Sequence, residues 1–178
     1  TANIENGRIL STTAANLSGN SGNNVLYAGA GNNVLNGGSG TDTVSYAYGL
    51  AGTTGVTVNL AASTAQATGG SGSDTLLSIE NLIGSAYADR LTGNTGGNSL
   101  SGAAGNDTLD GGAGIDTMAG GDGSDGYYVR DSGDIVSETN ATTSTGGTDI
   151  VYSTLAAYTL TANVENGRIL STTAANLT

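Results

Sequence analysis

The stretch from Gly102 to Tyr128 consists of three consecutive nonapeptides, GAAGNDTLD (102–110), GGAGIDTMA (111–119) and GGDGSDGYY (120–128). They share the pattern Gly-Gly-x-Gly-x-Asp-x-U-x, in which U is apolar. Glycine permits positive φ angles and close backbone approach, so the first six residues can form a tight loop. The last three residues predict a short strand whose middle side chain points inward, because side chains alternate along a strand. The inward residues are Leu109, Met118 and Tyr127.

This pattern resembles the RTX, or hemolysin-type, calcium-binding repeat. The resemblance implies an all-β fold, a right-handed parallel β-roll or β-solenoid with calcium in the GGxGxD loops. Two nonapeptides would form one coil with a loop on each side. A flexible Gly/Asp-rich linker is disfavoured, because further copies occur at 19–27, 28–36, 37–45, 69–77, 84–92 and 93–101. An EF-hand is rejected, because no Glu closes the run DGSDG.

Position six of the nonapeptide is predicted to stack along the edges of the solenoid. Because every second nonapeptide lies on the same edge, one stack contains Asp89, Asp107 and Asp125, and the other contains Asn98, Asp116 and Asp134. Neighbouring coils lie about 4.8 Å apart, and carboxylates at that distance repel one another unless a cation lies between them. Calcium takes about six to eight oxygen ligands in flexible geometry, whereas magnesium demands a tighter octahedron. We therefore expect about four to six calcium ions.

The resemblance also implies the ligands. The first of two neighbouring loops provides the carbonyls of positions two and four, the second those of positions one and three, and both provide position six. The implied sets are Asn20, Gly22 and Asn24 with Gly37, Ser39 and Asp42; Gly70, Gly72 and Asp74 with Gly84, Ala86 and Asp89; Ser85, Tyr87 and Asp89 with Gly102, Ala104 and Asp107; Asn94, Gly96 and Asn98 with Gly111, Ala113 and Asp116; Ala103, Gly105 and Asp107 with Gly120, Asp122 and Asp125; and Gly112, Gly114 and Asp116 with Val129, Asp131 and Asp134. The loop 129–134 lacks the glycines of the motif, so it departs most from the family pattern.

Some positions leave two interpretations open. Asn24 offers an oxygen but no charge, so its site with Asp42 is expected to be weak or empty; alternatively, stacked Asn side chains hydrogen-bond along the edge. Glu80 belongs to an Ile/Val-Glu-Asn tripeptide that recurs at 4–6, 79–81 and 164–166. We expect it to have a structural role rather than to bind metal. Asp149 follows a degenerate copy of the motif and has no clear partner.

The repeats divide the chain into four segments. Residues 1–45 are expected to form Asn-rich, metal-poor coils, and 46–68 a strand or hairpin on the flank of the roll. Residues 69–134 are the predicted calcium-binding roll, and 135–178 are degenerate strands. Residues 161–178 repeat residues 1–18 with differences only at Ile4/Val164 and Ser18/Thr178. This predicts a tandem array in which one repeat comprises residues 1–160 and the next begins at Thr161.

Composition limits the partners. The formal charge of −11 disfavours nucleic acid, which needs a basic surface, and a basic membrane-binding patch is absent too. It also opposes compaction without counter-ions, so we expect folding to depend on calcium. The sequence has no cysteine, no transmembrane run and no signal-peptide pattern. The resemblance implies export by a type I system, whose C-terminal signal would lie outside this segment.

The residue types also bear on function. Without His or Cys, the chain has no Ser-His-Asp or Cys-His arrangement and no usual zinc site, so we do not expect an enzyme. The favoured function is a calcium-dependent structural repeat of an extracellular adhesin, surface layer or fibre, with neighbouring copies joined end to end. The alternatives are a module that binds ice or carbohydrate, or the secretion and folding domain of an exported RTX enzyme or toxin.

Overall fold

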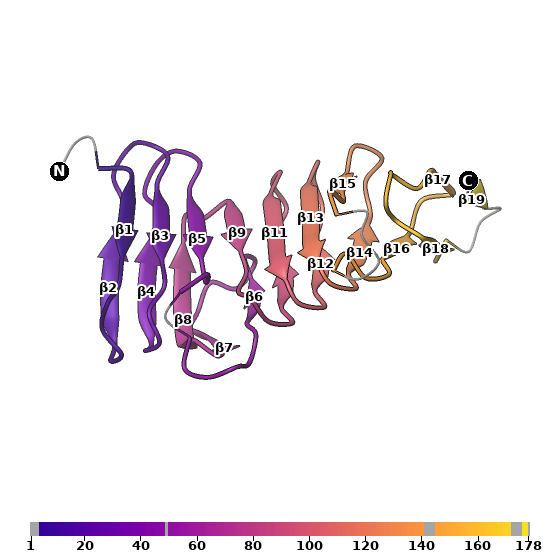
Figure 1. Cartoon of the computed structure of the whole chain (residues 1–178). Coiled ribbons are helices and arrows are strands. Elements are labelled where there is room, and N and C mark those ends of the chain that lie inside the picture. The colour runs from indigo at the N-terminus through magenta and orange to yellow at the C-terminus, as the bar shows by residue number, and fades with distance from the viewer. Residues whose placement is uncertain (1–3, 49, 141–144, 172–175, 178) are drawn as a thin grey trace.

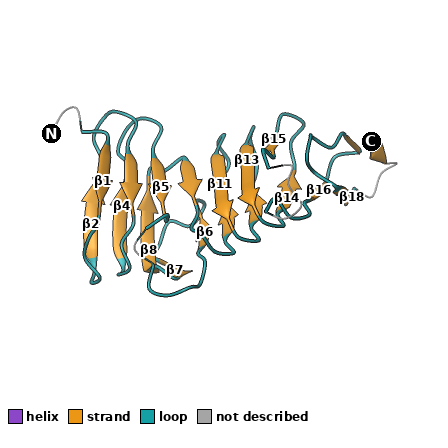
Figure 2. Cartoon of the chain, viewed as in Figure 1, coloured by secondary structure: helices purple, strands orange, loops and turns teal. Residues whose placement is uncertain are grey.

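Strands follow the nonapeptide phase along the chain. A computed structural model describes residues 4–48, 50–140, 145–171 and 176–177, and the regular elements of this part are all β-strands (Figures 1 and 2). Most nonapeptide strands begin just after position six, as in Thr108–Asp110 after Asp107. Parallel strands of successive coils stack along one axis, which confirms the predicted β-solenoid. None of the described segments forms a helix that could cross a membrane.

One wall of the solenoid is a continuous parallel sheet of seven strands. In spatial order these are β1 (Asn6–Arg8), β3 (Val25–Tyr27), β5 (Thr43–Ser45), β9 (Asn81–Ile83), β11 (Ser99–Ala104), β13 (Thr117–Asp122) and β15 (Ile135–Ser137). From β9 onward the register advances by one regular coil per strand, from Asn81 through Ser99 and Thr117 to Ile135. Each of these steps is as long as two nonapeptides, which is the coil length that the repeats predict.

The opposite wall is divided into two sheets. The first contains β2 (Ala15–Ser18), β4 (Asn33–Asn36), β8 (Gly72–Leu77) and β7 (Gln66–Gly69). The second contains β6 (Thr57–Asn59), β10 (Arg90–Thr92), β12 (Thr108–Asp110), β14 (Gly126–Val129), β16 (Ile150–Ser153) and β18 (Asn166–Ile169). A separate pair of strands, β17 (Ala157–Tyr158) and β19 (Asn176–Leu177), lies at the C-terminal end.

The core is a double ladder of inward side chains, in which a strand typically contributes one apolar residue. Each of the following is at most 2% exposed: Leu26, Val44, Leu82, Leu100, Met118 and Val136 from the seven-stranded wall, and Val58, Leu91, Leu109, Tyr127 and Val151 from the opposite wall. The predicted inward positions are therefore confirmed. Burying one such side chain stabilises a fold by about 1.5–3 kcal/mol, but a ladder one residue wide leaves the loops outside the apolar core.

Residues 46–68 were expected to form a strand or hairpin on the flank of the roll, and the range contributes one strand to the wall and one to a hairpin. Strand β6 pairs in parallel with β10 and places Val58 opposite Leu91, while β7 folds back antiparallel on β8. This insertion separates β8 from β10. Consequently Asn33 donates its N–H to Asp74 Oδ1 at 2.8 Å, and Asp89 Oδ1 accepts instead from the Val56 N–H at 2.6 Å.

The insertion overturns one predicted ligand set. Gly70, Gly72 and Asp74 do not face Gly84, Ala86 and Asp89 in neighbouring coils, because β8 stacks on β4 and β6 occupies the place next to β10. The short sequence separation between Asp74 and Asp89 therefore does not mark a shortened coil.

Loops of neighbouring coils lie so close together that replacing one of their glycines should destabilise the fold. Gly114 has a φ of +119°, and an added Cβ would lie 2.7 Å from the Gly96 carbonyl oxygen of the preceding loop. Gly52 has a similar φ of +114°, but an added Cβ would meet nothing within 4 Å. We expect Gly52→Ala to lower the free energy of unfolding by about 1–3 kcal/mol through backbone strain alone. Gly114→Ala should lower it by about 1–3 kcal/mol more through overpacking.

Urea unfolding of both variants in saturating calcium measures this difference. Equal destabilisation by the two substitutions would contradict the close stacking of successive loops.

Candidate metal centres

Strand pairing places the position-six residues in two columns, because each stands directly before a strand. Along the seven-stranded wall the column is Glu5, Asn24, Asp42, Glu80, Asn98, Asp116 and Asp134. Along the opposite wall it is Asp89, Asp107, Asp125, Asp149 and Glu165. Both predicted stacks, the one around Asp107 and the one around Asp116, are therefore present, each as part of a longer column.

A backbone ladder holds the carboxylates of each column in one orientation. The N–H of Asp89 donates to Asp107 Oδ1, and the N–H of Asp107 donates to Asp125 Oδ1, both at 2.7 Å. Along the opposite edge, the N–H of Asn98 donates to Asp116 Oδ1 at 2.7 Å. In each pair, the first oxygen of the later carboxylate is therefore satisfied by the earlier coil.

The second oxygen of these carboxylates has no such partner. Among the described residues, buried Oδ2 atoms without a hydrogen bond occur at Asp42, Asp107, Asp116 and Asp125. Each of these residues is the later aspartate of an implied ligand set. Burying an ionised carboxylate without a partner is costly, so these atoms mark places where a cation would be bound.

Backbone carbonyls converge on the same spaces between loops. An added Cβ at position-four Gly40, Gly105 or Gly114 would lie 2.7–2.8 Å from the position-four carbonyl oxygen of the preceding loop, so those carbonyls face forward. Carbonyls of the later loop face back: Asp122 O accepts the Gly105 N–H at 2.8 Å. Two neighbouring loops therefore direct several neutral oxygens and one or two carboxylates at one space, which is the ligand set that calcium prefers.

Four of the implied sets are brought together by this stacking. They are Asn20, Gly22 and Asn24 with Gly37, Ser39 and Asp42; Ser85, Tyr87 and Asp89 with Gly102, Ala104 and Asp107; Asn94, Gly96 and Asn98 with Gly111, Ala113 and Asp116; and Ala103, Gly105 and Asp107 with Gly120, Asp122 and Asp125. The residues present fit calcium at these four places, and each set contains one of the unpartnered oxygens.

The set that ends at Asp134 is wrong in two of its carbonyls. Val129 continues strand β14, and its carbonyl accepts the Thr154 N–H at 3.0 Å in the following coil instead of facing back. The carbonyl of Asp131 is used in a local turn by the Asp134 N–H at 3.1 Å. Asp134 Oδ2 also accepts the N–H groups of Arg130 and Asp131. Without the glycines, this loop satisfies its own carboxylate.

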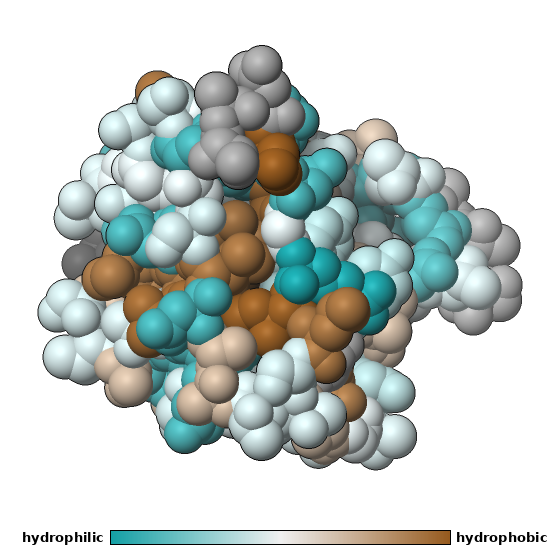
Figure 3. Space-filling model, turned by 90° about the vertical axis from the view of Figure 1, so that its left-hand side faces the viewer, coloured by the Kyte–Doolittle hydropathy of each residue, from teal (hydrophilic) through white to brown (hydrophobic). Residues whose placement is uncertain are grey.

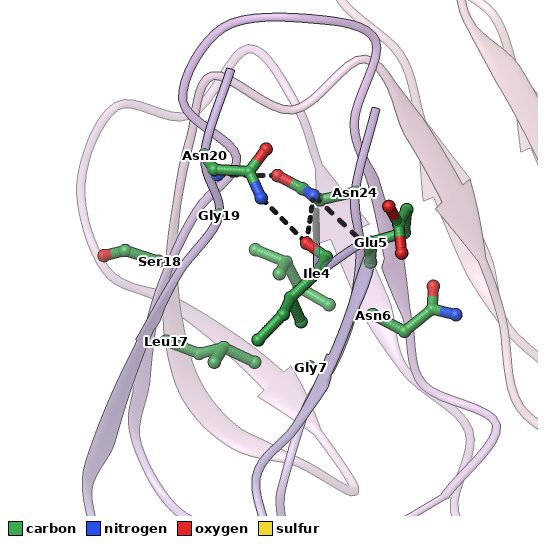
Figure 4. A pocket seen from close by; sticks show the side chains of 10 residues that line it. Ile4, Glu5, Asn6, Gly7, Leu17, Ser18, Gly19, Asn20 and Asn24 are labelled. Carbon is green, nitrogen blue, oxygen red and sulfur yellow. Dashed lines mark hydrogen bonds between the residues drawn. The ribbon is translucent and has the colours of Figure 1, made fainter. Parts of the chain in front are cut away.

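Asparagine at position six forms hydrogen bonds with backbone carbonyls of the preceding coil. The Asn24 amide donates to the carbonyls of Ile4 and Glu5 at 3.1 and 3.4 Å (Figure 4), and the Asn98 amide donates to the Glu80 carbonyl at 2.8 Å. These amide groups donate to carbonyl oxygens that would otherwise be available to a cation, so they take its place. The alternative of Asn hydrogen bonding therefore holds on the side toward Glu5 or Glu80, while Asp42 and Asp116 keep an unpartnered oxygen on the other side.

Sequence reasoning missed four members of the columns, of which Glu5 is exposed at the N-terminal end. Glu80 Oε2 accepts the Asp42 N–H at 2.8 Å, Asp149 Oδ1 accepts the Asp125 N–H at 2.8 Å, and Glu165 Oε2 accepts the Asp149 N–H at 2.9 Å. Asp149 thus has partners on both sides, contrary to expectation. Glu80 could have been found, because it lies one regular coil of 18 residues before Asn98. Asp149 was hidden by a spacing of 24 residues from Asp125.

Burial raises the pKa of several aspartates in the columns. It raises the pKa of Asp107 to about 7, with a further contribution from the charges of Asp125 and Asp89. Burial likewise raises the pKa of Asp125 to about 6, aided by Asp149 and Asp122. The pKa of Asp116 is also raised, mainly by burial. Ionisation of the column therefore opposes the metal-free fold.

These shifts predict opposite pH dependences with and without calcium. A carboxylate whose pKa is raised in the folded state contributes stability that is complete below its unfolded pKa of 3.8 and is lost as pH rises through about 6–7. Calcium binds only the ionised form. We expect the Tm in calcium-free buffer to fall between pH 4 and pH 7.5, and the Tm in saturating calcium to rise over the same range. Thermal unfolding followed by circular dichroism measures both slopes, and slopes of the same sign would contradict the assignment.

Comparison with known proteins agrees with this geometry. A family profile described as the RTX calcium-binding nonapeptide repeat (4 copies) matches residues 13–44, 83–118 and 92–127. No curated protein matches this chain in sequence. The matched ranges contain all four loop pairs that the structure brings together. The matched parts of this chain therefore consist of RTX calcium-binding nonapeptide repeats, and the described residues form a β-solenoid.

Proposed function

We propose that this chain is a calcium-dependent structural module of a secreted, tandemly repeated extracellular protein such as an adhesin, a surface layer or a fibre. RTX calcium-binding repeats are typical of secreted proteins. The observation that carries the proposal is the stacking of position-six residues in two columns, with buried unpartnered oxygens at Asp42, Asp107, Asp116 and Asp125. Calcium between the loops would neutralise these columns and tie each coil to the next.

Folding and stiffness would then depend on the same ions. The chain carries a formal charge of −11, and its apolar core is a narrow ladder. Both features weaken the metal-free fold. In a cytosol poor in calcium the module would stay loose enough for export. Outside the cell, affinities of about 10⁻⁴ to 10⁻³ M, which are typical of extracellular modules, would suffice to fold it.

The repeated terminal sequence supports end-to-end joining. Residues 166–169 have the same sequence as residues 6–9. Strand β18 pairs in parallel with β16, with Ile150 opposite Asn166 and Ser153 opposite Ile169. The first strand of a following unit can therefore pair with β16 in the place of β18. Glu165, the counterpart of Glu5, joins the carboxylate column through the Asp149 N–H.

This pairing implies that a sheet on one wall of a unit continues as the sheet of the other wall in the next unit. Strand β1 begins the seven-stranded wall, whereas β18, which has its sequence, ends the six-stranded sheet. In a tandem array the six-stranded wall of one unit would continue as the seven-stranded wall of the following unit. The solenoid would then run through the junction without a linker.

The N-terminal end of the described fold offers a matching surface. An apolar patch lies at its centre and polar groups surround it (Figure 3). Ile4 is 54% exposed there, and the adjoining hollow is lined by Leu17 and Leu26 among others (Figure 4). In an array, the coil of β16 from the preceding unit would cover this patch.

A two-unit protein, with residues 1–160 followed by residues 1–178, tests the proposal. We expect calcium to fold it into one continuous rod, whose amides at 166–169 exchange much more slowly than in the single unit, because the second unit covers the free edge of β18. Hydrogen exchange and small-angle scattering measure these two properties, with magnesium as the control ion. Two bodies joined flexibly, with unchanged exchange at 166–169, would refute the array.

A further inference from the structure

The loop that follows β15 departs from the nonapeptide in length and in its first residue. Asp125 and Asp149 are separated by 24 residues, which is more than one regular coil. Strands β14 and β16 nevertheless pair in register, with Gly126 opposite Ile150, so the additional residues leave the coil intact. Glu138 lies 18 residues after Gly120 and stands where the motif has its first glycine.

Glu138 points into the space between two loops. It is 7% exposed, and its Oε1 accepts the Gly120 N–H at 3.2 Å. One carboxylate oxygen from each of Asp125, Glu138 and Asp149 lies within 4.8 Å of the other two. Asp125 and Asp149 are each 1% exposed. Three buried carboxylates thus share one space.

Two oxygens of this group have no hydrogen-bond partner among the residues that the structure describes. Asp125 Oδ2 and Glu138 Oε2 are buried and accept no hydrogen bond, whereas the other oxygen of each is held by a backbone N–H. The one ion pair among the described residues joins Arg130 to Asp110, so no arginine in that part of the chain neutralises the group. The carbonyl of Gly123 also faces this side, because an added Cβ on Gly147 would lie 2.5 Å from its oxygen.

We propose that Asp125, Glu138 and Asp149 form a cation site of three carboxylates, which binds calcium more tightly than the sites between GGxGxD loops. The inference deepens the calcium-dependent function proposed above and rests on it. In the four other loop pairs at most two carboxylates stand at position six, and Asp122 is exposed outside them. Calcium affinity rises with the number of charged ligands. The same charge would favour trivalent lanthanides even more strongly. The site would fill first and fix the coil at which β16 receives the next strand.

Terbium is a suitable probe, because Tyr127 lies beside the site. Its hydroxyl accepts the same Gly120 N–H that Glu138 Oε1 accepts, at 2.8 Å. Terbium bound between the three carboxylates should therefore show emission sensitised by tyrosine, and Tyr127→Phe should reduce it. Calcium added in competition reports the affinity of the site.

The test compares Glu138→Gln with Glu5→Gln in the full chain. Glu5 is exposed at the N-terminal end of its column, and the Asn24 amide donates to the Glu5 carbonyl, so no ion is assigned to Glu5. Its substitution therefore removes the same charge away from the site. We expect Glu138→Gln to weaken the tightest binding step by about tenfold or more, and Glu5→Gln to leave it unchanged. Unchanged terbium and calcium titrations of Glu138→Gln would overturn the site but not calcium-dependent folding. Absence of calcium binding by the unmodified chain would instead overturn the proposed function.

A crystallographic measurement avoids the risk that Glu138→Gln fails to fold. Crystals of the unmodified chain grown in calcium and soaked in terbium should show an anomalous peak between Asp125, Glu138 and Asp149. Peaks between the other loops without one at this position would overturn the proposal.

Discussion

Repulsion between carboxylates that are stacked and buried at the spacing of a β-sheet is the constraint on which this fold depends. Neighbouring coils lie about 4.8 Å apart, and the strand register places Asp89, Asp107 and Asp125 directly above one another. The backbone ladder satisfies one oxygen of each later carboxylate and leaves the other buried without a partner. Calcium ions between the loops would relieve that repulsion and link consecutive coils, so one interaction would determine both stability and stiffness.

The chain varies this arrangement along its length. Where an Ile/Val-Glu-Asn tripeptide replaces a glycine-rich loop, as at Glu5 and Glu80, the next coil carries Asn24 or Asn98, and the amide donates directly to the preceding carbonyls. There the amide occupies the place that a cation would otherwise take. Beyond β15 the change is the opposite, because Glu138 adds a third carboxylate beside Asp125 and Asp149. A single solenoid would thereby combine coil interfaces that need no metal with interfaces that need it.

Most of the fold follows from the nonapeptide phase, because the apolar residue two places after Asp determines the inward ladder. The loop pairs around Asp42, Asp107, Asp116 and Asp125 could be predicted for the same reason. The failures arise where the coil length changes. The insertion 46–68 supplies β6, which separates Asp74 from Asp89, and the lengthened coil before Asp149 conceals its pairing with Asp125. The prediction for Val129 failed because its carbonyl faces the following coil, where it accepts the Thr154 N–H.

The most direct test of the central claim is a calcium titration of this chain, from none to about 10 mM, followed by far-ultraviolet circular dichroism with magnesium as the control. The account predicts a weak β-signal without metal and a cooperative gain that calcium produces and magnesium does not. A chain already fully folded in chelator, with no change on adding calcium, would show that the apolar ladders and Asn hydrogen bonds suffice. That result would contradict calcium as the link between coils.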